Sequence, residues 1–173
     1  MKTNKEAFSD YLLLEKKYSL HTVGAYLNDI ASFELFLKES FDQENADLVN
    51  YSQVRSWIVF LVDQNISNVS INRKMASLKA FYKFLLKTKQ IEINPMLKHK
   101  SLKTPKVIQI PFSEKELQDL LTVIDVPVGF EEIRDKLIVE MFYVTGMRRA
   151  ELIHLMIKNV DRSNNTIKVL GKR

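Results

Sequence analysis

The chain has 173 residues, 46% of them hydrophobic, no cysteine and a formal net charge of +5. This composition predicts a globular protein with a real core, and it excludes disulfide bonds and any zinc site built on thiolates. The three histidines, at positions 21, 99 and 154, lack metal-ligand spacing, so we expect neither a metal nor another cofactor. No run of about eighteen uncharged apolar residues occurs, and the N-terminus does not look like a signal peptide, so we expect a cytoplasmic protein without a membrane span.

Four amphipathic helices are predicted in the first part of the chain. Apolar residues recur at steps of three and four, as on one face of a helix. The expected segments are Glu6 to Lys17, Thr22 to about Leu37, Ser52 to Asp63 with Ser52 as a plausible N-cap, and Ser70 to about Thr88.

The fourth of these segments has one apolar and one basic face. Its apolar stripe consists of Ile71, Met75, Leu78, Tyr82 and Leu85. Polar, basic and small side chains occupy much of the remaining surface: Asn72, Arg73, Ala76, Lys79, Ala80, Lys83 and Lys87. Such a face suits a nucleic-acid groove, where Arg, Lys and Asn reach phosphates and base edges. A solvated lysine-rich face is the alternative.

A basic linker is predicted to follow, because Asn94-Pro95 stops the helix. Four lysines and no acidic residue lie from Lys98 to Lys106, and Pro105 and Pro111 favour an extended chain. We expect a first domain at residues 1–95, a linker at 96–111 and a second domain at 112–173. Taken alone, the lysine cluster is equally well interpreted as a solvated linker.

The second domain is predicted to begin with a capping box formed by Ser113 and Glu116. A helix from about Phe130 ends at the Thr145-Gly146 break, and another begins at about Arg149. The alternating residues 166–170 predict a strand with nothing to pair against, so the sequence looks truncated.

Arg148 is therefore predicted at the start of a helix, where unpaired backbone N–H groups and a guanidinium favour a phosphate. The competing interpretation is a simple surface ion pair between Arg148 and Glu151, which are three residues apart. His154, one turn further on, is interpreted as a partly buried packing residue.

The segment Thr145-Gly146-Met147-Arg148, followed by Glu151-Leu152, resembles the first-arginine motif of the tyrosine recombinases, the Xer proteins and phage integrases. Further pieces match that family in order: Ser19-Leu20-His21-Thr22, then Ile71-Asn72-Arg73-Lys74-Met75, then Asn94-Pro95. The resemblance implies a mainly α fold, in which a four-helix SAM-like core-binding domain precedes an incomplete mixed α+β catalytic domain.

The resemblance also implies roles for individual residues. Contact with double-stranded DNA falls to the second and fourth helices, at Thr22, Asn72, Arg73, Lys79 and Lys83. Arg148 matches the first catalytic arginine, which would stabilise charge on the scissile phosphate. Glu151 matches the glutamate of the motif and would be an orienting or structural residue. Lys172 matches the hairpin lysine that would protonate the departing 5′ oxygen.

The remaining catalytic groups of that family are a second arginine, a histidine with its partner and the nucleophilic tyrosine, and they would lie beyond residue 173. We therefore expect this chain to bind duplex DNA without cleaving it, and the full-length parent to act as a tetramer of recombinase subunits on DNA. Two alternatives remain: a naturally truncated DNA-binding protein that modulates a full-length recombinase at its sites, and a helical protein-interaction module with an incidental basic face.

Overall fold

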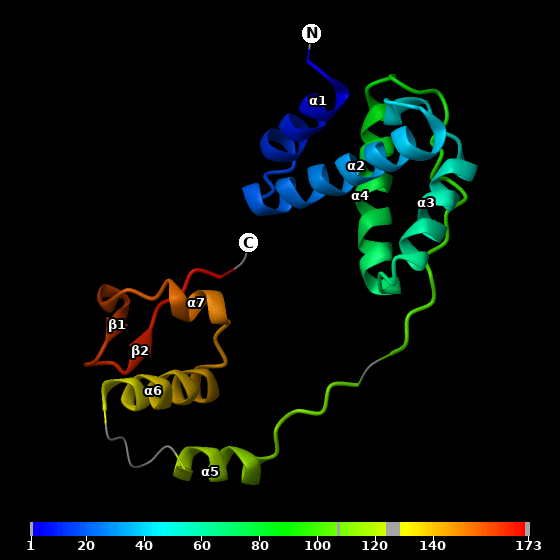
Figure 1. Cartoon of the computed structure of the whole chain (residues 1–173). Helices are drawn as coiled ribbons and strands as arrows, with labels where there is room; N and C mark the ends of the chain where they lie inside the picture. Colours follow the sequence, from blue (N-terminus) through cyan, green and yellow to red (C-terminus); the bar gives the residue numbers. More distant parts are fainter. Residues whose placement is uncertain (1, 107, 124–128, 172–173) are drawn as a thin grey trace. The chain divides into compact units, whose positions relative to one another are not determined.

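The computed structural model describes residues 2–106, 108–123 and 129–171; for residue 123 it describes the backbone alone. The chain divides into two compact units, Met1–Val107 and Ile108–Arg173. Figure 1 shows both units. The fold is mainly α, as the sequence predicts, with one small sheet in the second unit.

Four α-helices and two short helical turns form the first unit: α1 (Asn4–Asp10), the π-helical turn η1 (Tyr11–Glu15), α2 (Leu20–Phe41), the 3-10 turn η2 (Ala46–Leu48), α3 (Tyr51–Asp63) and α4 (Asn68–Lys87). Side-chain caps fix where the long helices begin. Ser19, Asn50 and Ser67 each accept a hydrogen bond from the backbone N–H three residues on. The expectation of Ser52 as the cap of α3 was wrong, because Asn50 and Gln53 form a reciprocal capping box two residues earlier.

The first predicted helix, Glu6 to Lys17, is shorter and less regular than expected. After α1 the backbone widens into a π turn, in which the N–H of Lys16 donates to the carbonyl of Tyr11. Lys17 then takes a left-handed conformation with φ of 54° and ends the segment. The wider turn keeps Leu12 buried, while Leu14 is left largely exposed.

The apolar stripes predicted from the sequence form the core of the first unit. All five predicted stripe residues of α4 are buried. They pack with apolar side chains of the other three helices, among them Phe8, Ile30, Phe33, Val54 and Trp57. The hydroxyl of Tyr82 donates to the carbonyl of Ala46 at 2.7 Å, which fastens α4 to η2.

The chain after α4 stays on the first unit for longer than the predicted linker boundary suggests. Met96 is 1% exposed and belongs to the core, and Leu102 packs against it. Residues 104–106 and 108–112 are exposed and have no helix or strand.

The second unit contains α5 (Glu114–Val123), α6 (Phe130–Thr145), α7 (Arg149–Ile153), the 3-10 turn η3 (Ile157–Asn159) and the strands β1 (Val160–Asp161) and β2 (Thr166–Ile167). The capping box at Ser113 and Glu116 is confirmed, with both reciprocal bonds present. The prediction of an unpaired final strand was wrong. β2 pairs antiparallel with β1, and Val160 lies opposite Ile167. A turn at Asp161 to Asn165 joins the two strands, so the partner of β2 directly precedes it in the chain.

The two units differ sharply in burial. Every buried residue that the structure describes lies in the first unit, and none of the described residues from 108 to 171 is buried. In the second unit, large apolar side chains such as Val144, Ile157 and Leu170 are about four-fifths or more exposed. Its α-helices therefore present apolar surface that packing within the described residues does not cover.

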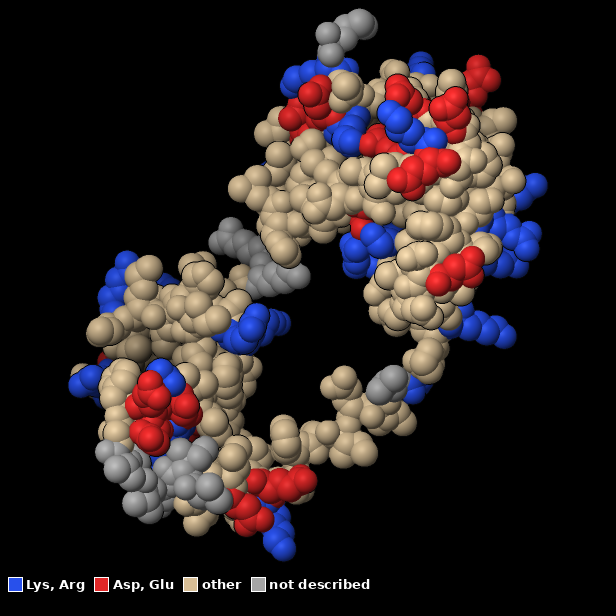
Figure 2. Space-filling view, viewed as in Figure 1, with Lys and Arg blue, Asp and Glu red and all other residues tan. Residues whose placement is uncertain are grey.

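Charged side chains are distributed over both units. On the faces visible in Figure 2, Lys and Arg are interspersed with Asp and Glu and do not form one uninterrupted positive field. Binding of a polyanion would therefore depend on particular unpaired cations, more than on the net charge of +5. Among the described residues, no helix is long and apolar enough to cross a membrane.

Candidate nucleic-acid interface

Arg148 lies in a sharp turn between α6 and α7. α6 ends at Gly146, whose φ of 62° lies in the left-handed region that favours glycine. The Gly146 N–H donates to the carbonyl of Phe142, and the Met147 N–H donates to Thr145 Oγ1 at 3.2 Å. Arg148 follows in extended conformation as the N-cap of α7, so the sequence-based expectation of a helix start at this residue is confirmed.

Glu151 holds Arg148 through two contacts. One carboxylate oxygen accepts the backbone N–H of Arg148 at 2.7 Å, and the other accepts its guanidinium at 2.8 Å. The Arg148 side chain is 71% exposed, whereas that of Glu151 is only 10% exposed. The hydrogen bond from the Arg148 backbone, followed by that from its side chain, lowers the pKa of Glu151 and keeps it ionised. Glu151 thus fixes the base of Arg148 while most of the guanidinium faces solvent.

The surface ion pair considered from the sequence is therefore present, and it does not exclude a phosphate role. A guanidinium has five N–H donors, and only one contact to Glu151 is made by the side chain. α7 has only five residues, so its dipole is small and the charge of Arg148 itself dominates the site.

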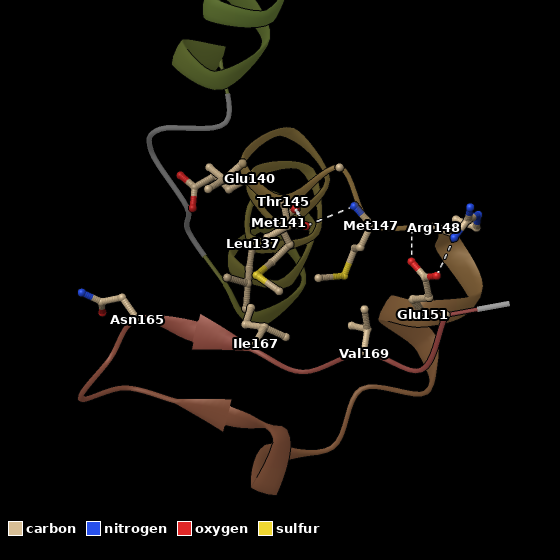
Figure 3. A pocket seen from close by; sticks show the side chains of 13 residues that line it. Leu137, Glu140, Met141, Thr145, Met147, Arg148, Glu151, Asn165, Ile167 and Val169 are labelled. Carbon is tan, nitrogen blue, oxygen red and sulfur yellow. Dashed lines mark hydrogen bonds and ion pairs between the residues drawn. The ribbon is translucent and has the colours of Figure 1, made fainter. Parts of the chain in front are cut away.

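A cavity of about 670 Å³ lies beside Arg148. In Figure 3 the side chains of Leu137, Met141, Met147, Ile167 and Val169 surround it, and Arg148 and Glu151 lie at its edge. Its wall is largely apolar, so the cavity does not itself resemble a phosphate pocket.

Lys172 lies outside the described residues, so its proposed acid role stays a prediction. The packing role expected for His154 was wrong: the residue is exposed, caps the end of α7 and places Nδ1 2.7 Å from the carbonyl oxygen of Ala150.

Lys79 and Lys83 are exposed on α4, and neither ammonium group has an ion pair or hydrogen bond with another described residue. They lie four positions apart and therefore on the same side of the helix. Two unpaired ammonium groups at this spacing are available to an external anion without loss of an internal contact.

Arg73 is engaged within the first unit. Its guanidinium donates two hydrogen bonds to the carboxylate of Asp29 on α2, at 2.7 and 2.9 Å. Lys74 and Ser77 donate to the same carboxylate, at 3.1 and 2.7 Å. The side chain of Arg73 is nevertheless 54% exposed, so its remaining donors can reach solvent.

Asp29 is the buried partner at this site, although helical periodicity places it off the apolar stripe of the second helix. It is 2% exposed, and burial, the largest single influence, favours its neutral form. The hydrogen bonds from Arg73, Ser77 and Lys74 outweigh burial, so the pKa of Asp29 lies below its ordinary value. One signal was present in the sequence: an acidic residue directly before Ile30, on the buried face of the second helix.

Asn72 and Thr22 also have internal partners. The side-chain amide of Asn72 exchanges two hydrogen bonds with the backbone of Leu102. Thr22 lies in the first turn of α2, where its backbone N–H and its hydroxyl both contact the Ser19 hydroxyl, at 3.3 and 2.9 Å. DNA contact by all five predicted residues therefore remains a prediction; among those five, the three cations Arg73, Lys79 and Lys83 are exposed.

A metal site has no support in the described part of the chain, where no three His, Asp or Glu side chains are grouped closely enough to hold an ion.

Comparison with known families accounts for both units. Residues 6–89 match the phage integrase N-terminal SAM-like domain, and residues 110–173 match the phage integrase family itself. The chain belongs to the phage integrase family of tyrosine recombinases. The four-helix first unit is accordingly its SAM-like domain, and the second unit is the matched part of its catalytic domain.

Relatives of this integrase-family chain include tyrosine recombinases named XerC. That of Pediococcus pentosaceus is 37% identical over 169 residues, covering 95% of this chain and 55% of the relative. That of Bacillus subtilis is 34% identical over 171 residues, covering 95% and 54%. The chain thus spans about half the length of these recombinases.

Solved integrases share the fold. The Tn1549 transposon integrase, in complex with circular intermediate DNA, superposes with a TM-score of 0.72 at 18% identity, covering 98% of this chain and 54% of that one. The integrase of mycobacterium phage Brujita gives a TM-score of 0.54 at 19% identity, covering 98% and 54%. At these identities the likeness concerns the fold alone.

Proposed function

We propose that this chain binds double-stranded DNA and supplies the first catalytic arginine of a site-specific tyrosine recombinase. The observation that carries the proposal is Arg148, an exposed guanidinium fixed at its base by Glu151 within a matched phage integrase segment. The unpaired Lys79 and Lys83 on the SAM-like unit supply the phosphate contacts.

The proposed chemistry follows from the charges. Attack on a phosphodiester places additional negative charge on the non-bridging oxygens, and a guanidinium can donate to two of them at once. Glu151 occupies one direction around Arg148 and thereby limits the orientations that the side chain samples. We assign no nucleophile among the described residues around Arg148, so strand cleavage is proposed only for a recombinase that carries the complete catalytic domain.

Duplex binding is tested by a salt titration of the chain with a labelled DNA duplex. We expect affinity to fall steeply between 50 and 200 mM salt, because each neutralised phosphate releases counterions. Replacing Lys79 and Lys83 by Ala should weaken binding and lower the slope of log K against log[salt] by about one to two.

A matched control is Lys38→Ala with Lys2→Ala, two exposed lysines that are already paired with Glu44 and Asp10. An unchanged salt slope in the Lys79 and Lys83 variant would remove the α4 lysines from the interface. Absence of salt-dependent binding by the native chain would favour a protein-interaction module.

The catalytic role is tested in a recombinase whose chain continues through the remainder of the domain. Arg148→Ala should lower the rate of covalent DNA attachment by roughly 10²–10³-fold, the effect of removing one preorganised donor to a developing oxyanion. Duplex affinity should change little, because one contact of many is lost. Normal strand cleavage by this variant would contradict the assignment.

A further inference from the structure

The first part of the predicted linker is fastened to α4 by two asparagines. Asn72 Nδ2 donates to the carbonyl of Leu102 at 2.9 Å, and the Leu102 N–H donates to Asn72 Oδ1 at 2.8 Å. One helical turn earlier, Asn68 Nδ2 donates to the carbonyl of Lys103 at 2.9 Å. A side-chain amide that pairs with both polar groups of one residue reproduces the bonding of a neighbouring strand.

Other contacts hold the same segment. Met96 is buried in the core, and its N–H donates to Asn94 Oδ1 at 2.8 Å. The ring of His99 lies 6.4 Å from that of Tyr51 on α3, measured between centroids. From Thr104 to Phe112, by contrast, no hydrogen bond joins any described residue to another.

We propose that Asn72, supported by Asn68, is a positioning residue that determines where the free connection between the two units begins, and that it does not read DNA bases. We call the hydrogen bonds of Asn72 to Leu102 and of Asn68 to Lys103 the clamp. It places the start of that connection at Thr104. This replaces the role as a DNA contact that the family resemblance implies for Asn72. The inference rests on the proposed function only for its DNA readout, since the clamp itself lies within one unit.

The consequence is a shorter tether. The stretch between the Asn94-Pro95 stop and the Ser113 cap comprises seventeen residues, 96–112, and the stretch beyond the clamp comprises nine, 104–112. At ~3.3 Å per extended residue, the maximum reach falls from ~56 Å to ~30 Å. The effective concentration of one tethered binding unit near the other varies as about the −3/2 power of tether length, so the clamp raises it about two- to threefold.

Hydrogen exchange of the whole chain tests the clamp directly. In the native protein we expect the Leu102 amide to be protected. Asn72→Ala should speed its exchange roughly tenfold and speed tryptic cleavage after Lys100, while amides of the α4 core such as that of Leu78 keep their rates. Asn72→Asp keeps an acceptor for the Leu102 N–H but removes the donor to the Leu102 carbonyl. It should also speed exchange of the Leu102 amide relative to the native chain, because a carboxylate then faces that carbonyl.

Two variants guard against ambiguous results. Asn28→Ala, on the exposed side of α2 and without a hydrogen bond to any described residue, should leave exchange at Leu102 unchanged. If Asn72→Ala unfolds the unit, Asn68→Ala removes only the bond to Lys103 and should speed cleavage after Lys103 alone. Unchanged exchange and cleavage in the Asn72 and Asn68 variants would overturn the proposal.

DNA binding separates positioning from base reading. As a positioning residue, Asn72→Ala should lower duplex affinity about two- to threefold, with the same salt slope and the same sequence preference. A loss of more than tenfold with relaxed preference at one base pair would show that Asn72 reads a base and would overturn the proposal. If the native chain binds no duplex, the proposed function fails, whereas the exchange experiment still decides on the clamp.

Discussion

At the scale of single residues, Asp29 is the one charged side chain that is buried among the described residues. Its carboxylate is nearly inaccessible and accepts four hydrogen bonds, from Arg73, Lys74 and Ser77. A buried charge without partners would be strongly destabilising, so the network is needed as a whole. It also joins α2 to α4 at the base of the exposed Arg73 guanidinium.

Removing this charge should destabilise the first unit. We expect Asp29→Asn to lower the free energy of unfolding by about 2–3 kcal/mol at pH 7, less than the 3–5 kcal/mol of a fully buried broken pair because Arg73 and Lys74 can turn to water. Urea denaturation followed by Trp57 fluorescence measures the change. Glu39→Gln, an exposed and unpaired position on the same helix, should stay within about 0.5 kcal/mol.

The same network predicts a pH dependence. The pKa of Asp29 is lowered in the folded protein, so its stabilisation is fully present above the unfolded pKa of about 4 and is lost as pH falls through the folded value. The difference in stability between the native chain and Asp29→Asn should therefore shrink steadily below pH 4. A difference that stays constant from pH 7 to pH 2.5 would show that the carboxylate charge does not stabilise the fold.

At the scale of elements, one hydroxyl connects α4 to a turn that no periodicity reveals. Tyr82 is fully buried within the α4 stripe, and its hydroxyl donates to the carbonyl of Ala46 in η2. Burial, above all, raises the pKa of Tyr82 and keeps it a neutral donor. The aromatic ring thus serves packing, while the hydroxyl satisfies a buried carbonyl.

Tyr82→Phe should cost about 1–2 kcal/mol of unfolding free energy, because it leaves the Ala46 carbonyl buried without a donor. Thermal or urea unfolding of the chain measures it. Tyr18→Phe removes a hydroxyl from a half-exposed ring of the same unit and should have almost no effect. Equal stability of the two variants would mean that water reaches the Ala46 carbonyl.

At the scale of the whole molecule, stability is concentrated in one unit. All described buried side chains belong to the SAM-like unit, and the described part of the second unit has only exposed or half-exposed apolar residues. Since burial of apolar surface is the main favourable term in folding, the second unit should contribute little to cooperative unfolding.

We therefore expect residues 1–107, prepared alone, to unfold within a few degrees of the whole chain and with nearly the same calorimetric enthalpy. The chain beyond residue 108 should exchange its amides quickly in the absence of DNA. Two well-separated cooperative transitions in the whole chain would contradict this expectation. A Tm of the 1–107 piece more than about 10 °C below that of the whole chain would contradict it as well.

The sequence by itself determined the features that depend on local chemistry. Helical periodicity located the four helices and the apolar stripe of α4. The spacing of Ser113 and Glu116 predicted their capping box, and the glycine before Met147 predicted the turn that precedes Arg148. Such signals act over one to four residues and are legible in a single sequence. The motif around Arg148 and the order of its companions likewise indicated the family.

Only the tertiary structure decided which polar side chains pair with one another. Arg73 and Asn72 look equally available on the helical face, yet their partners, Asp29 and Leu102, lie 44 and 30 residues away. Periodicity separates the buried face of a helix from its exposed face. It does not predict which residue from a distant part of the chain forms a hydrogen bond with a side chain on the exposed face. For the same reason, pairing of β2 with β1 and the weak burial of the second unit emerged only when the elements were placed together.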